Sequence, residues 1–175
     1  AQATADKIKA EAEATAKAAE ARAALGRLQA ALDSGAAYGS ALASLGPVPE
    51  VLADNAATGL PTLAQLETEF PAVARAALDA ALRANMGESW ADRVTSFLRT
   101  QTGARSLTPR EGNDPDAVLS RAEAALHTGN LTAALAELAA LPPEAQAALK
   151  DWQALATTRL AAEQAVADLA ATISE

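Results

Sequence analysis

The stretch that decides the fold covers residues 114–173, DPDAVLSRAEAALHTGNLTAALAELAALPPEAQAALKDWQALATTRLAAEQAVADLAATI. Its apolar residues recur at spacings of three and four, a pattern typical of helices that bury one face. Asp114 and Pro115 predict the start of a first helix, because aspartate caps helices well and proline is favoured at the first helical position. Gly129 predicts the end of that helix, and the proline pair at 142–143 predicts the start of a long last helix. The stretch therefore indicates a helical hairpin followed by one long helix.

The rest of the chain also favours an all-α class. Alanine is the commonest of its hydrophobic residues, and alanine favours helix because it loses no side-chain entropy there. Isoleucine occurs only at Ile8 and Ile173, and no run alternates polar and apolar residues for long enough to predict a strand. Glycines and prolines then divide the middle of the chain, which predicts short helices at residues 40–45, 50–57, 62–70 and 71–84.

Residues 1–36 read as one long N-terminal helix of alanine, lysine, glutamate and arginine. Leu25, Leu28 and Leu32 fit a spacing of three and four, but the apolar seam before them is weak. Two interpretations stay open. The helix is either the end of a coiled coil in which these leucines mediate oligomerisation, or a solvated helix that packs on the domain only from Leu25 onward. We expect this helix to be followed by a compact helical domain at residues 37–175.

Charge and composition exclude several classes of protein. A net charge of −8 and a pI near 4.7 disfavour nucleic-acid binding, which depends on a basic surface. The absence of cysteine removes disulfides, thiolate nucleophiles and sulfur-ligated zinc. No apolar run reaches the roughly 20 residues that cross a bilayer. Because the chain starts at Ala1 without methionine, we expect a fragment or a processed form that a membrane anchor could precede.

No motif in the chain predicts catalysis, a metal site or a cofactor. His127 is the only histidine, and its place near a helix end predicts a solvent-facing residue that interacts with the helix dipole. Glu111, Asp114 and Asp116 lack the spacing of a calcium-binding loop, and helix capping explains them better. We therefore expect a protein that is not an enzyme.

One segment concentrates aromatic and basic residues in an otherwise acidic chain: residues 88–110, ESWADRVTSFLRTQTGARSLTPR. Its spacing predicts a helix with one apolar stripe, followed by an extended connection that carries arginines. Either the stripe enters a lipid interface while the arginines meet anionic headgroups, or it packs in the core or across a homodimer interface. The scarcity of aromatic residues favours the protein contact. The candidate membrane- or partner-binding residues are Trp90, Arg93, Val94, Phe97, Leu98, Arg99, Arg105 and Arg110.

Two further sets of residues carry a family resemblance. The first, within residues 112–160, comprises Asp116, Ala122, Gly129, Asn130, Leu131, Ala134, Leu138, Asp151, Trp152 and Arg159. The second, within residues 45–78, comprises Gly59, Leu60, Pro61, Thr62, Leu66, Phe70, Ala74 and Arg75. In these residues the chain resembles the C-terminal domain of the mitofilin family, over about residues 25–170. The high alanine, leucine, arginine and acidic content is similar to that of an alphaproteobacterial member.

The resemblance implies an inner-membrane protein that shapes crista junctions or related membranes. It implies a transmembrane helix and a coiled coil before this domain, which would lie on the periplasmic side, equivalent to the intermembrane space. Members of the family are implied to self-associate and to bend membranes. We therefore expect a non-enzymatic, homo-oligomeric scaffold, with an anionic membrane surface and other proteins as candidate partners. The alternative is a soluble helical adaptor that binds a protein without lipid contact.

Overall fold

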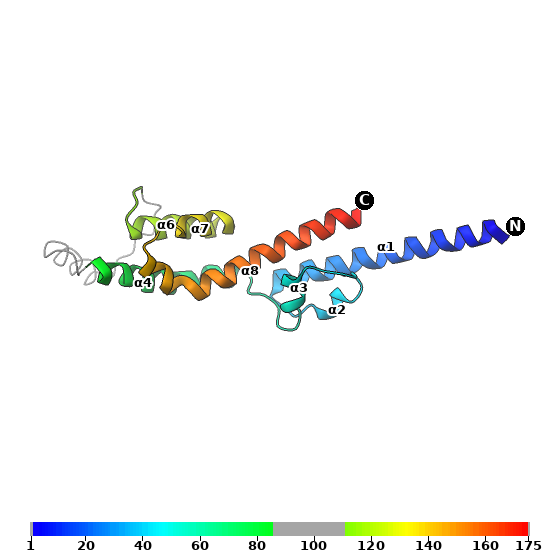
Figure 1. The fold of residues 1–175 in the computed structure, drawn as a ribbon, viewed down its shortest axis with the longest axis horizontal. Helices are drawn as coiled ribbons and strands as arrows, with labels where there is room; N and C mark the ends of the chain where they lie inside the picture. The colour runs from blue at the N-terminus through cyan, green and yellow to red at the C-terminus, as the bar shows by residue number, and fades with distance from the viewer. Residues whose placement is uncertain (1, 86–110, 175) are drawn as a thin grey trace. The chain divides into compact units, whose positions relative to one another are not determined.

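The computed structural model of the chain describes residues 2–85 and 111–174, and α-helices account for most of them (Figure 1). The helices are α1 (Gln2–Ser34), α2 (Gly39–Leu42), α3 (Glu50–Asp54), α4 (Leu63–Asn85), α6 (Pro115–His127), α7 (Leu131–Leu138) and α8 (Pro143–Ser174). No strand occurs in these two ranges, and the predicted all-α class is confirmed. The predicted hairpin and long last helix correspond to α6, α7 and α8.

The chain divides into two compact units, each with its own core. Unit 1 comprises Ala1–Thr62 and Thr158–Glu175, and unit 2 comprises Leu63–Thr157. Helix α8 therefore contributes its first part to unit 2 and its last part to unit 1. The boundary predicted between residues 36 and 37 falls inside unit 1, because the C-terminal part of α1 packs with the segments that follow it.

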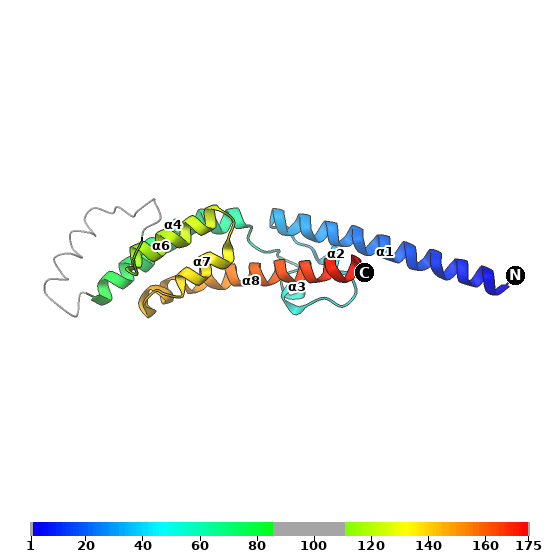
Figure 2. The same ribbon diagram turned by 90° about the horizontal axis from the view of Figure 1, so that it is seen from above.

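The core of unit 1 joins α1 to the short helices and to the end of α8. In Figures 1 and 2 the last turns of α8 lie beside α1, near α2 and α3. Three leucines of α1 and three residues of α8 are buried together in this core. The buried residues of this core are Leu25, Leu28, Leu32, Tyr38, Ala41, Leu52, Leu60, Ala162, Ala165 and Val166.

Gly59 closes the loop that carries α2 and α3 back to α1. Its φ of +76° lies in the left-handed region, which side chains disfavour. A Cβ atom at this position would lie 2.4 Å from the carbonyl oxygen of Gly35 and 2.6 Å from that of Ala36. Tyr38 donates its backbone N–H to the carbonyl of Ala56 at 2.8 Å, which holds the two segments together beside this contact. Only glycine fits this close approach of two backbone segments.

Helix α4 runs through Pro71, where the sequence predicted a break between two helices. The prediction was wrong, because one buried stripe continues through the proline and packing outweighs the loss of one helical hydrogen bond. The stripe consists of Leu66, Phe70, Ala74, Ala77 and Ala81, all nearly inaccessible to solvent. Val73, Leu78 and Leu82 of the same helix are only partly buried.

The predicted ends of the hairpin helices are confirmed. The carboxylate of Asp114 accepts the backbone N–H of Ala117 at 3.1 Å, and Pro115 is the first residue of α6. Gly129 follows α6 with φ +75°, and the side chain of Asn130 caps α7 by accepting the N–H of Ala133 at 2.9 Å. These caps satisfy backbone donors that a helix start leaves without intrahelical partners.

Candidate functional site

The membrane- or partner-binding residues predicted in the segment 88–110 lie outside the residues that the structure describes. They are Trp90, Arg93, Val94, Phe97, Leu98, Arg99, Arg105 and Arg110. Their role stays a prediction. Within the described residues, the candidate sites are the exposed part of α1 and a buried arginine in α8.

The leucines predicted to mediate oligomerisation are part of the core of unit 1. Leu25 is 9% exposed, Leu28 is fully buried and Leu32 is 4% exposed. Their side chains pack against α8 and the loop segments of the same chain. In this conformation they are not accessible to a second copy. The stretch of α1 that is exposed on every face lies before them in the sequence.

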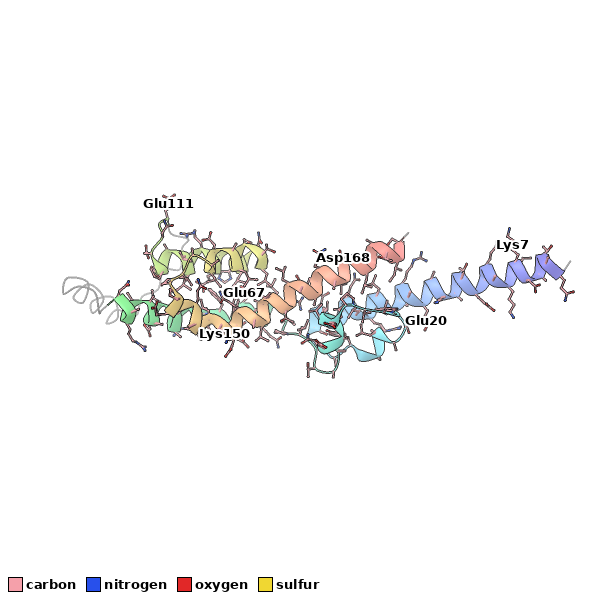
Figure 3. All side chains as sticks on the ribbon, viewed as in Figure 1. Lys7, Glu20, Glu67, Glu111, Lys150 and Asp168 are labelled. Carbon is pink, nitrogen blue, oxygen red and sulfur yellow. The ribbon has the colours of Figure 1, made fainter. Side chains whose placement is uncertain are left out.

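The N-terminal part of α1 is exposed on every face. Each residue from 2 to 17 is exposed, and Ile8 retains 62% of its accessible surface. Lys7 lies on this stretch, beside which no other helix of unit 1 is drawn (Figure 3). Its pair with Glu11 at 3.8 Å is solvent-exposed, and such pairs stabilise a helix by only about 0.3–0.5 kcal/mol. The stretch ends at a shallow groove of about 310 Å³ lined by Ala14, Lys17, Ala18, Ala21 and Ile173.

Arg159 is the most buried basic residue that the structure describes, with 5% of its surface exposed. Its Nη1 donates to the carbonyl of Leu32 at 2.5 Å and to the carbonyl of Pro61 at 3.3 Å. Its Nε donates to the carboxylate of Glu163 at 2.7 Å, and the two side chains form an ion pair. The guanidinium thus holds the C-terminal end of α1, the end of the loop segment and its own helix. It lines a pocket of about 360 Å³ together with Gln29, Leu32, Asp33, Glu163 and Val166.

The burial of Arg159 could have been predicted from the spacing of residues along α8. Trp152, Ala156, Arg159 and Val166 follow one another at spacings of four, three and seven, so they lie on one face of α8. The other three residues are buried, and an arginine on such a stripe has to find acceptors inside the protein. The sequence interpretation used Arg159 only as part of a family resemblance. Its acceptors were not predictable, because Leu32 is 127 residues away along the chain.

In unit 2 the first part of α8 is fixed by Trp152, which is 3% exposed. Its indole Nε1 donates to the carbonyl of Leu66 at 3.0 Å, and its ring meets that of Phe70 edge to face with centroids 5.0 Å apart. Aromatic pairs of this geometry add about 0.5–1.5 kcal/mol to the free energy gained by burial. Trp152 therefore anchors α8 on α4 within this unit.

Polar contacts join the helices at the surface of unit 2. Arg121 of α6 donates to the carboxylate of Glu137 of α7 at 2.9 Å and to the carbonyl of Gly112 at 2.7 Å. His127 is solvent-facing, as predicted, but its Nδ1 also contacts the carboxylate of Glu67 on α4, which the sequence did not predict. These contacts fasten the hairpin, and they assemble no nucleophile and base.

No group of three or more histidine, cysteine, aspartate or glutamate side chains in residues 2–85 and 111–174 could hold a metal ion. Within the same ranges no helix is long and apolar enough to span a bilayer.

The comparison with known families agrees with this arrangement. Residues 40–174 match the family described as mitofilin, mitochondrial inner membrane protein. The chain belongs to the mitofilin family. The match extends over α2 to α8 and so covers Trp152 and Arg159, whose packing is described above. No curated protein and no solved structure matches the chain.

Membership in the mitofilin family confirms the resemblance found in the sequence, over slightly different bounds. The match begins at residue 40, whereas the resemblance was expected from about residue 25. Helix α1 precedes the matched region, although its leucines complete the core of unit 1. The mitofilin family is one of inner-membrane proteins.

Proposed function

We propose that this chain is a non-enzymatic scaffold domain that helps to organise the inner membrane from its periplasmic side, the equivalent of the intermembrane space. The observation that carries the proposal is the match of residues 40–174 to a family of inner-membrane proteins. The described geometry supports it, since the buried side chains of Trp152 and Arg159 donate hydrogen bonds that hold helices to one another.

Self-association through the exposed part of α1 is the first element of this proposal. A helical stretch that is exposed on every face gains nothing from tertiary packing. Residues 2–17 are in this situation. A second copy of the same stretch would bury alanine faces closely, because alanine lets helix backbones approach. We therefore place the oligomer contact before Leu25.

Contact with an anionic membrane is the second element. The residues proposed for it are the arginines and the apolar stripe of the segment 88–110, with Arg99 and Phe97 as representatives. Each basic residue near an anionic surface contributes about 1 kcal/mol. The net charge of −8 opposes binding, so the arginines have to act together on one face.

Vesicle sedimentation tests the membrane element. We expect the protein to sediment with vesicles containing anionic lipid and not with neutral vesicles, and to lose binding with Arg99→Glu or Phe97→Asp. Arg22→Glu, an exposed arginine of α1, is the matched control and should bind normally. Equal binding by Arg99→Glu and the parent protein would contradict lipid contact through this segment, and absence of binding by the parent protein would favour the adaptor alternative.

Sedimentation equilibrium tests the self-association element separately. Residues 2–17 are all exposed, so both cores should stay intact by circular dichroism when residues 1–17 are removed. We expect the truncated chain to be monomeric at concentrations at which the parent chain is oligomeric. An unchanged oligomer mass would place the contact elsewhere.

A further inference from the structure

The buried guanidinium of Arg159 does more than fill space in the core of unit 1. It reaches two backbone carbonyls and one carboxylate, which lie on three different parts of the unit. The carbonyl of Leu32 belongs to the last turn of α1, where a helix leaves carbonyls without intrahelical partners. The positive charge also complements the negative end of the helix dipole.

Unit 1 depends on such a contact because it is built from two separate stretches of the chain. The first stretch ends at Thr62 and the second begins at Thr158. Arg159 lies one residue inside the second stretch, and its acceptor Pro61 lies one residue inside the end of the first. Beyond Arg159, the buried residues by which α8 enters this core are Ala162, Ala165 and Val166, which are small.

No other basic residue could replace these contacts. A lysine ammonium is a single point charge on a flexible stem, whereas the planar guanidinium presents donors in fixed directions. Loss of the side chain would leave the buried carbonyl of Leu32 and the partly buried carbonyl of Pro61 without this donor, which is costly in a nonpolar environment. Burial of a charge is tolerated here because Glu163 is paired with it.

We propose that Arg159 is a clamp that closes unit 1, so that this unit opens and closes independently of unit 2. When the clamp opens, the last part of α8 separates from α1, and Leu25, Leu28 and Leu32 become accessible. Unit 2 stays folded in that state, because Trp152 and Phe70 hold α8 to α4 by contacts made within unit 2. The clamp is a conformational device, and it does not depend on the function proposed above.

Amide hydrogen exchange of the full chain tests the clamp region by region. Arg159→Met keeps the apolar stem and removes the donors, and Arg27→Met changes an exposed arginine of α1 as the matched control. We expect Arg159→Met to accelerate exchange at least tenfold in residues 25–34 and 160–170, with less than a twofold change in residues 117–138. Arg159→Lys should resemble Arg159→Met, and Arg27→Met should resemble the parent chain.

A milder variant keeps the test decisive if Arg159→Met does not fold. Glu163→Gln weakens one of the three contacts, and Glu144→Gln alters an exposed glutamate near the start of the same helix. We expect Glu163→Gln to accelerate exchange about two- to fivefold in unit 1 only, with no such effect of Glu144→Gln. Equal acceleration of exchange in both units would contradict the clamp. Equal exchange rates in a variant and its matched control, Arg159→Met with Arg27→Met or Glu163→Gln with Glu144→Gln, would contradict it as well.

Discussion

Replacing Gly59 by alanine gives the sharpest test of how unit 1 is held together. Two effects oppose a side chain here: the left-handed backbone and the close approach of the Gly35 carbonyl. Gly46 shows the backbone effect without the close approach, since its φ is +77° and a Cβ there would meet nothing within 4 Å. Gly46→Ala therefore measures the backbone effect alone, and Gly59→Ala measures both.

The magnitudes follow from these distances. A left-handed backbone with a Cβ atom costs roughly 1–2 kcal/mol, which is the expected loss of stability for Gly46→Ala. At Gly59 the Cβ would lie 2.4 Å from the oxygen of Gly35, whereas real Cβ contacts essentially never fall under 3.0 Å, so two backbone segments must separate. Such overpacking adds about 1–3 kcal/mol. Gly59→Ala should therefore lower the free energy of unfolding by about 2–5 kcal/mol.

Urea denaturation followed by far-ultraviolet circular dichroism measures both variants, with the shift in midpoint converted to free energy through the m-value. The reasoning requires Gly59→Ala to be the less stable variant by at least about 1 kcal/mol. If the two variants lose the same free energy, or if Gly46→Ala loses more, the contact between residues 35–36 and 59 does not constrain the loop as described.

Substitutions at three other positions test local features of the fold. Trp152→Phe should lower the free energy of unfolding by about 2–3 kcal/mol in urea denaturation, because the Leu66 carbonyl loses its indole donor and the smaller ring leaves a gap. Asp114→Ala should cost about 1 kcal/mol in the same assay and Asp114→Asn much less, since asparagine retains the cap. Burial raises the pKa of Tyr38 above 10.0, so the folded state keeps its proton longer than the unfolded state and stability should fall as pH rises above 10. Tyr38→Phe should abolish that alkaline loss in urea titrations at several pH values, and because Tyr38 is the only tyrosine, the phenolate absorbance reports its ionisation directly.

The starts and ends of several helices could be predicted, because they depend on residues close to them in the sequence. Asp114 with Pro115, and Gly129 with Asn130, act through side chains and φ angles within a few residues of each helix end. The course of α4 through Pro71 could not be predicted in the same way. It depends on the partners of its buried stripe, and a local rule about proline does not contain that information.

Sequence patterns could not predict the division into units or the contacts of Arg159. Both depend on residues that are far apart along the chain. The spacing on α8 shows that Arg159 lies on a buried face, but nothing local reveals that its acceptors are Leu32 and Pro61. The same holds for Leu25, Leu28 and Leu32. A seam of leucines has the same spacing whether it meets a second copy or another helix of its own chain.

The bond between Arg159 and the carbonyl of Pro61, 3.3 Å long, brings together the two points at which the chain leaves and re-enters unit 1. In topological terms, unit 2 is an insertion within a host fold. The host constrains where the inserted chain begins and ends, and it sets no limit on how long that chain is. In sequence, residues 86–110 fall between these two points, so a change in the length of the chain there leaves the bond between Arg159 and Pro61 within the host unchanged.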